Sequence, residues 1–575
     1  MRSHYVHFIG RLATIVPILA LGGGFVVLAD RDDVHFHPGN LVVSRSVYHN
    51  DADTVRVSPV PTALPPNCAL TSAPPAMCVT AVADGTYPFV FNNNGVDGSF
   101  GITSKIFLDQ LTPGGLFLDT LEVPDSPEDS RHREGDHLVT SFSSKSELAL
   151  NLSTSRRFLT FMGYVALIDQ LDASNSNTPL PFTVDPTNPV GEDFLRAVAQ
   201  VDEHGRFQFT ETNAYSGNNG RAAILNDTRG AHVYYTAGNA GNGNLDPQPE
   251  GIIVGAGAQI IDPSTKPEED QNPGVPTPVA SFWVSELGAD PVKLKDKVGK
   301  DDNFRGMTIH DQVLYFTKGS GSNGINTVYF VDTTGNACPL TSKTPGVGVP
   351  QPGATLPTTA LVYNGATLQT SGLPNNMCVL AGFPATPNKT KNFNPSNFPF
   401  GIWFADDNTL YVADEGDGNV GKTAATFYGP AAAQEFAGLE KWVFDSTTQV
   451  WNLAYTLQAG LGLGAPYIVP GYPIGNNGVK PWAPATDGLR NITGRVDPEG
   501  KVTIWGITST VSGSGDQGAD PNRLVVITDQ LAATTLPAGE SFKTLRTAKF
   551  GEVLRGVSFT PGTGAEKDKE HDRDR

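Results

Sequence analysis

The chain has 575 residues, of which 17% are charged and 9% are aromatic, and this composition is typical of a globular protein. Its formal net charge of −19 would repel nucleic acid and anionic membranes, so neither is an expected partner. Glycine (62 residues) and proline (44 residues) are abundant, and helical periodicity is absent beyond the N-terminus. We therefore predict an all-β fold.

The N-terminus has the pattern of a secretory signal. Arg2 and Arg11 precede a mostly apolar run at 12–29, which ends before a polar stretch that begins with Asp30. We expect residues 1–29 to be a cleaved signal peptide or an uncleaved signal-anchor, and we expect no other membrane span. The sequence therefore predicts a protein that is secreted, periplasmic or on the cell surface.

The four cysteines form two sequence-local pairs, Cys68 with Cys78 and Cys338 with Cys378. In an exported chain this spacing favours two disulfides that close local loops, although other pairings are open. A metal site is the alternative, but the chain has no Cys-x-x-Cys motif and no histidine near either pair.

Short runs of β-branched and aromatic residues alternate with turn residues along the rest of the chain. The first group has only three predicted strands, within 37–54, 101–109 and 115–123. A proline-rich insertion near 59–80 separates the first strand from the second.

The next five groups are each predicted to have four strands. The second group has 146–152, 158–165, 196–202 and 207–212, and the third has 221–225, 232–236, 251–255 and 280–287. The fourth has 305–309, 313–317 and 327–332, with an uncertain last strand near a second insertion at 338–398. The fifth has 401–404, 409–413, 440–444 and 451–456, and the sixth has 489–494, 501–506, 523–528 and 541–545.

A lone strand at 553–559 would supply the strand that the first group lacks. This arrangement predicts a six-bladed β-propeller over 35–561, closed by pairing of the N- and C-terminal strands. The insertions could hide a seventh blade. Two packed β-sandwiches are the structural alternative, but they do not explain the orphan strand. We expect a monomer, with a disordered charged tail at 562–575.

Two motifs resemble those of a known group of proteins. The phrase Leu410-Tyr-Val-Ala-Asp414 and the Arg-Gly-x-x-Phe/Ile strand openings are similar to those of exported propellers of the NHL, YVTN and SMP-30/gluconolactonase kind. The resemblance covers most of 35–561 as architecture. It implies the fold, and in gluconolactonase-like proteins a divalent ion bound in the channel is the catalytic centre.

Alignment of the predicted innermost strands places an arginine at one equivalent position in four groups. These arginines are Arg221, Arg305, Arg490 and Arg555, with Glu147 and Phe400 at this position in the other two groups. Innermost strands line a propeller channel, so the guanidiniums would converge at one mouth and could bind a carboxylate or phosphate. Alternatively, each arginine pairs with a loop acid and fills the channel; the candidate acids are Asp414, Glu415, Asp487 and Asp301.

Carboxylates are concentrated in two turns of the fifth group. Asp414, Glu415 and Asp417 are hard oxygen ligands that would suit Ca²⁺, and Asp406 and Asp407 lie in the other turn. The two turns are predicted at opposite faces of the blade, so these acids cannot all bind one ion. Solvated turns are the alternative interpretation.

The sequence contains neither a Gly-x-Ser-x-Gly nor a His-Glu-x-x-His motif. We therefore predict a binding or scaffolding role, with a small anion, a glycan or a protein as partner. The enzymatic alternative is a metal-dependent hydrolase of lactonase or phosphoesterase type that acts at the central channel. A structural cell-surface protein with a filled channel is the third interpretation.

Overall fold

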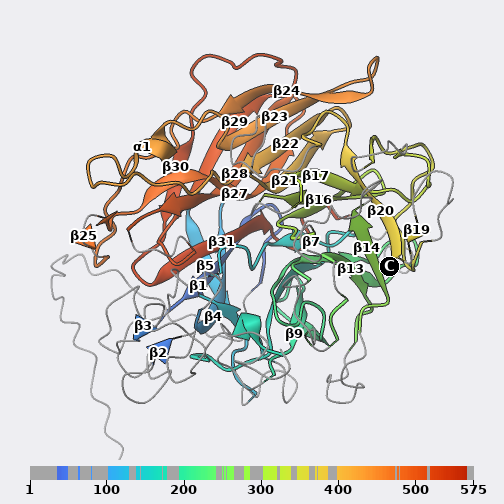
Figure 1. Cartoon of the computed structure of the whole chain (residues 1–575), viewed down its shortest axis with the longest axis horizontal. Helices are drawn as coiled ribbons and strands as arrows, with labels where there is room; N and C mark the ends of the chain where they lie inside the picture. The colour runs from blue at the N-terminus through green and yellow to red at the C-terminus, as the bar shows by residue number, and fades with distance from the viewer. Residues whose placement is uncertain are drawn as a thin grey trace, which may run out of the picture.

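The computed structural model shows six small antiparallel sheets arranged as blades around a central channel (Figure 1). The structure describes residues 35–48, 101–127, 137–142, 144–170, 173–177, 193–240, 249, 251–253, 256–264, 277–284, 302–319, 324–338, 346–361, 370–371, 373–385, 398–472, 476–477, 480–513 and 518–565, together with two short strands at 63–64 and 79–80. The protein is thus an all-β, six-bladed propeller, as predicted.

Each blade has four strands, which follow one another from the channel outward. Blade 1 has β31 (Glu552–Phe559), β1 (Leu41–Val47), β4 (Thr103–Leu111) and β5 (Phe117–Glu122). Blade 2 has β7 (Asn151–Leu152), β8 (Leu159–Tyr164), β9 (Arg196–Val201) and β10 (Phe207–Thr212). Blade 3 has β11 (Gly220–Asn226), β12 (Val233–Gly238), β13 (Ala258–Ile261) and β14 (Ala280–Val284).

Blade 4 has β15 (Met307–His310), β16 (Val313–Lys318), β17 (Thr327–Val331) and β20 (Leu373–Leu380). Blade 5 has β21 (Pro399–Asp406), β22 (Thr409–Asp414), β23 (Gly438–Asp445) and β24 (Val450–Leu457), and blade 6 has β27 (Ala485–Val496), β28 (Lys501–Val511), β29 (Arg523–Gln530) and β30 (Lys543–Thr547). The remaining described elements are short: β2 (Ala63–Leu64), β3 (Val79–Thr80), β6 (Thr140–Ser141), β18 (Val347–Gly348), β19 (Thr370–Ser371), β25 (Asn476–Asn477), β26 (Lys480–Pro481), a 3₁₀ turn (Ala173–Asn175) and α1 (Gly429–Ala432).

The two chain ends meet in blade 1. Strand β31 pairs antiparallel with β1, with Leu41 opposite Phe559 and Val47 opposite Glu552 (Figure 1). The predicted closure by the terminal strands is confirmed. Because every blade has a neighbour on both sides, closure leaves no free end to the ring of sheets.

The strand predicted at 146–152 is shortened to β7 (Asn151–Leu152), and two further strands differ from the sequence prediction. Strand β13 is at Ala258–Ile261 and not at 251–255, where Gly251 has a φ of +69° that suits a turn and not a strand. Strand β20 supplies the uncertain fourth strand of blade 4 and lies inside the stretch predicted as an insertion at 338–398. It also pairs in parallel with β14, which joins blades 3 and 4 into one sheet.

The predicted Cys338–Cys378 disulfide is present, with a Cα–Cα distance of 5.9 Å. Cys68, Cys78, the N-terminal segment 1–29 and the tail from residue 566 lie outside the described residues. Within the described part of the chain, no helix is long and apolar enough to cross a membrane.

Neighbouring blades contact each other through glycines of their inner strands. A Cβ atom at Gly306 of blade 4 would overlap the carbonyl oxygen of Phe400 in blade 5, and one at Gly401 would overlap that of Arg490 in blade 6. The hydroxyl of Thr317 accepts a hydrogen bond from the Gly306 amide (2.9 Å) and donates one to the Phe400 carbonyl (2.5 Å). Glycine therefore lets the hydroxyl of the second strand reach the next blade.

The same combination of a glycine and a bridging hydroxyl joins blade 1 to blade 2. A Cβ at Gly556 would overlap the Leu148 carbonyl oxygen. The Ser44 hydroxyl accepts from the Gly556 amide (2.7 Å) and donates to the Leu148 carbonyl (2.9 Å). Between blades 2 and 3, Thr160 donates to the carbonyl of Ala223 (2.6 Å) without a glycine.

Irregular register accompanies these contacts. The inner strands of blades 1, 3, 5 and 6 each have a β-bulge or similar shift where they pair with the second strand. The shifts fall between Leu554 and Val557, Gly220 and Ala222, Pro399 and Ile402, and Leu489 and Ile492. A bulge re-aims side chains, so the strict two-residue alternation of a strand is lost at the channel.

Replacement of Gly306 by alanine tests the contact between inner strands. We expect Gly306→Ala to lower the free energy of unfolding by about 1–3 kcal/mol, because the new methyl group must push back the Phe400 carbonyl. The matched control is Gly114→Ala, where the nearest atom to the new Cβ is 3.8 Å away. Denaturant unfolding of both variants is the measurement, and equal stabilities would contradict this account of the ring.

The disulfide gives a second prediction. Non-reducing peptide mapping should recover Cys338 and Cys378 in one cross-linked fragment. Cys378→Ser should lower stability by about 2–4 kcal/mol, since the bond closes a loop of 40 residues in the unfolded chain. Recovery of the two cysteines in separate fragments would show that the bond does not form.

Candidate functional site

The four predicted arginines lie in or just before the inner strands of four blades. Arg221, Arg490 and Arg555 belong to β11, β27 and β31, and Arg305 lies two residues before β15. All four are buried, with 2–6% of their surface exposed. Arg305 lies close enough to Arg221 and to Arg490 for the charges to repel one another. The structure therefore brings these three together, whereas the alignment predicted convergence of all four.

Backbone and hydroxyl oxygens hold the Arg555 guanidinium. Its guanidinium donates to the carbonyls of Phe142 and Ser144, and its Nε donates to the hydroxyl of Ser46 at 3.2 Å. Phe142 and Ser144 belong to the segment that leads into blade 2. Arg555 thus fixes this segment against blade 1.

The segment 144–147 crosses the mouth of the channel. The Ser146 hydroxyl accepts a hydrogen bond from Nη1 of Arg305 in blade 4. The Lys145 ammonium lies 3.3 Å from the carboxylate of Glu415, which follows the second strand of blade 5. One short segment therefore contacts three other blades and adds a fifth cation to the mouth.

Glu415 is the carboxylate at the centre of these cations. Its Oε2 also lies 3.3 Å from Nε of Arg490, and only 3% of the side chain is exposed. Burial alone would raise the pKa of Glu415, but Lys145, Arg305 and Arg490 hold it below its usual value. Glu415 is therefore ionised at neutral pH, and the pairing with Arg490 matches the alternative in which a loop acid neutralises an arginine.

Glu147 is buried beside the cluster but binds other groups. It accepts hydrogen bonds from the hydroxyls of Tyr164 (2.6 Å) and Thr140 (2.7 Å) and from the amide of Ser141 (3.0 Å). Its charge acts on Arg221, although the two side chains form no ion pair. Glu147 therefore offsets part of the cationic charge from a fixed position.

Arg221 and Arg305 are incompletely satisfied. Nη1 of Arg221 donates to the carbonyl of Phe304 (2.6 Å) and to the side chain of Asn303. Nε of Arg221 and Nε of Arg305 are both buried and have no hydrogen-bond partner among the described residues. Burial, followed by the charge of Arg305, lowers the pKa of Arg221 well below its usual value.

The mouth thus brings several buried cations together. Its five cations are Arg221, Arg305, Arg490, Arg555 and Lys145, and the carboxylates that act on the Arg221–Arg305 pair are Glu147 and Glu415. Two buried donors among these cations, which have no partner among the described residues, are complementary to an anion that accepts from both guanidiniums.

The carboxylates predicted to bind calcium are used in turns. Asp414 accepts from the amides of Phe398 (2.9 Å) and Gly416 (2.8 Å), and Asp417 accepts from the amide of Asn419 (2.8 Å). Among the residues that the structure describes, the grouping of three metal-type ligand atoms within 4.8 Å is Asp332 with the disulfide-bonded Cys338 and Cys378. The structure does not bring Asp414, Glu415 and Asp417 together in this way, and calcium stays a prediction.

Of the other acids that the sequence considered, Asp487 lies against the turn at 414–418 and Asp407 lies away from it. Asp487 is buried and accepts from the Gly418 amide (2.9 Å) and the Gln434 side chain (2.6 Å). Asp407 lies in the turn after β21, where it contacts His310 at 3.0 Å. That turn and Asp414 are at opposite ends of β22, as predicted, and Asp301 lies outside the described residues.

Sequence reasoning missed the polar residues just before the inner strands. Lys145, Ser146 and Asn303 precede the aligned positions by one or two residues and contact the cluster. Their position in the sequence could have predicted this role, since loops that lead into inner strands converge on the channel mouth.

Comparisons with known proteins leave the family open. No protein-family model matches the chain, and no curated protein matches it. Among solved structures it is similar to a GH74 enzyme of Niastella koreensis, with 10% identity and a TM-score of 0.28 over 77% of this chain and 44% of that one. Two variants of an apocarotenoid oxygenase of Synechocystis align with 9% identity and a TM-score of 0.20 over 80% of this chain and 59% of theirs. The chain thus spans about half the length of these structures.

Asp487 gives a pH prediction. Burial raises its pKa to about 7, so the folded state holds a proton that the unfolded state releases near pH 4. The resulting stability is fully present below pH 4 and is lost as the pH rises through 7. Asp487→Asn should therefore reduce the fall in stability between pH 4 and 7.

The control variant is Glu435→Gln, which replaces a nearby exposed acid. Its free energy of unfolding should vary with pH as that of the wild-type protein does. In Asp487→Asn the free energy of unfolding should still fall between pH 4 and 7, but by a smaller amount. The remaining fall comes from Glu540, whose pKa is also raised to about 7 by burial and by the charge of Asp529. Denaturant unfolding at each pH gives the profile. An unchanged slope in Asp487→Asn would show that Asp487 is ionised in the folded protein at these pH values.

Proposed function

We propose that this propeller is a binding protein that holds a small anion between Arg221 and Arg305 at one mouth of its channel. The observation that carries the proposal is the pair of buried Nε atoms without hydrogen-bond partners in the described chain. Glu147 and Glu415 are the carboxylates whose charges act on Arg221, and Arg305 lies close enough to repel it. A carboxylate or a phosphate is the chemical class that fits.

Two buried charges of the same sign destabilise the folded protein when no opposite charge lies between them. Arg221 and Arg305 are 4% and 6% exposed, so water screens their repulsion poorly. An anion between them would satisfy the free donors and offset the repulsion. A guanidinium presents parallel N–H groups that match two oxygens of one anion, which favours carboxylate and phosphate over halide.

The hydrolase of lactonase or phosphoesterase type remains the alternative, together with the finer resemblance to gluconolactonase-like propellers. It requires acids from different blades that converge on one ion. Asp414, Glu415 and Asp487 already bind backbone amides, cations and a glutamine. These contacts favour binding over catalysis. Secretion or surface exposure and the monomeric state are also part of the proposal.

Calorimetric titration of the purified protein with phosphate and with acetate tests the proposal. We expect saturable binding of at least one of them, and we expect Arg305→Ala and Arg221→Ala to weaken it about tenfold or more. Arg206→Ala is the control, because this arginine is 75% exposed and pairs with Asp202 at the rim. A ligand at a hundred times its dissociation constant should raise the free energy of unfolding by about 2.7 kcal/mol.

Arg305→Lys separates loss of charge from loss of fold. It keeps a cation in the mouth and should bind more tightly than Arg305→Ala, while circular dichroism shows that both variants are folded. The proposal is wrong if wild type binds neither anion, or if Arg305→Ala and Arg221→Ala bind as wild type does.

A further inference from the structure

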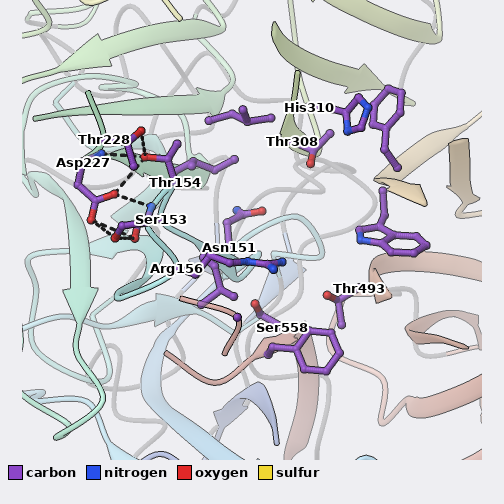
Figure 2. Close-up of a pocket in the computed structure, with 18 of the residues that line it drawn as sticks. Asn151, Ser153, Thr154, Arg156, Asp227, Thr228, Thr308, His310, Thr493 and Ser558 are labelled. Carbon is purple, nitrogen blue, oxygen red and sulfur yellow. Dashed lines mark hydrogen bonds between the residues drawn. The ribbon is translucent and has the colours of Figure 1, made fainter. Parts of the chain in front are cut away.

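A large cavity occupies the other end of the channel. Its volume is about 850 Å³, within the range of small-molecule sites (Figure 2). The inner strands of all six blades contribute to its lining, through Asn151, Ile224, Thr308, Trp403, Thr493 and Ser558. Four of these positions come three residues after an arginine of the first mouth, a separation of about 10 Å along a strand. The cavity is therefore distinct from the arginine cluster.

Arg156 stands on a rigid turn at this cavity. It follows β7 with a φ of +63°, and its carbonyl accepts a hydrogen bond from the Gly562 amide (2.8 Å). The preceding residues are fixed by Asp227, which accepts from the Ser155 amide (2.8 Å) and the Thr154 hydroxyl (3.1 Å). Figure 2 shows this network beside Arg156. The turn is therefore held in place before any ligand binds.

Arg156 also lines the cavity. Its guanidinium forms no hydrogen bond or ion pair with the part of the chain that the structure describes, and in Figure 2 it extends into the cavity near Asn151, Ser558 and Thr493. Burial alone lowers the pKa of Arg156, without any carboxylate that would raise it. The nearby Asp227 is already saturated by the hydroxyl and amide groups of its turn.

Neutral hydrogen-bonding groups surround this cation. The hydroxyls of Thr308, Thr493 and Ser558 line the cavity and make no hydrogen bond to other described residues. Asn151 donates through Nδ2 to the Ala223 carbonyl (3.2 Å), which leaves its Oδ1 free to accept. These groups stand on four different blades, so they can bind several polar groups of one ligand at once.

Aromatic rings form one wall. Trp403 is half-buried and its indole lies over Gly494, where a Cβ would overlap the ring. Beside it, Phe404 stacks on His310 with a centroid distance of 4.3 Å and an interplanar angle of 6°. Glycine at 494 thus keeps a flat apolar surface next to the hydroxyl groups.

We propose that this cavity binds an acidic sugar of the uronic acid type, with its carboxylate on Arg156. The hydroxyls of Thr308, Thr493 and Ser558 and the amide of Asn151 would bind the ring hydroxyls, and Trp403 would contact the apolar face of the ring. A free guanidinium alone would fit any carboxylate. The dispersed hydroxyl groups and the aromatic wall add the requirement for a polyhydroxylated ring.

Calorimetry with D-glucuronate, D-galacturonate, D-glucose and acetate tests this site. We expect one of the uronates to bind wild type about tenfold or more tightly than glucose and acetate. Arg156→Gln should remove that preference, since it deletes the charge and keeps most of the side-chain length. Thr493→Val should weaken binding of the uronate with little effect on acetate.

Two controls separate this inference from the proposed function. Arg206→Ala should bind the uronate as wild type does, and so should Arg305→Ala, which disables the opposite mouth. Conversely, Arg156→Gln should keep the phosphate or acetate binding that depends on Arg305. The acidic-sugar proposal is wrong if the wild-type protein binds neither uronate, or if it binds glucose as tightly as a uronate. It is also wrong if Arg156→Gln binds the uronate with wild-type affinity.

Discussion

The contact between inner strands of neighbouring blades is the constraint on which the rest of the structure depends. At Gly306, Gly401 and Gly556 the backbone of one blade touches a carbonyl of the next, and the hydroxyls of Thr317 and Ser44 bridge two of these gaps. The residue before Gly306 and before Gly556 is an arginine. The same short stretch of chain therefore packs one blade against the next and supplies an arginine to the channel mouth.

This coupling explains how a strongly acidic protein keeps a cationic interior. The formal net charge of the chain is −19, yet the channel mouth holds four buried guanidiniums. Much of the cationic charge is satisfied by neutral oxygens: Arg555 binds two carbonyls and Arg221 binds one. Carbonyl oxygens stabilise a guanidinium without cancelling its charge, and the site keeps its attraction for an anion.

The fold was more predictable than the sites. Turn residues between short β-rich runs, and the orphan strand at 553–559, were enough to predict six blades and their closure. Strand β20 could not be placed because it lies in a proline-rich stretch. Strand β13 was misplaced because the glycines around Gly251 could mark either the start or the end of a strand. The arginine positions followed from register. Lys145 and Arg156 did not, since one lies in a connecting segment and the other on a turn with positive φ, where strand periodicity gives no direction.

The closure of blade 1 also has a consequence for biosynthesis. Arg45 of β1 lies 3.0 Å from Glu552 of β31, and 507 positions separate the two residues along the chain. At a ribosomal rate of about 5–20 residues per second, β1 emerges roughly half a minute to two minutes before its partner strand exists. During that interval one edge of β1 lacks its native partner. The nascent chain must therefore carry an open sheet edge through most of its synthesis, and whatever shields that edge in the cell acts before the ring can close.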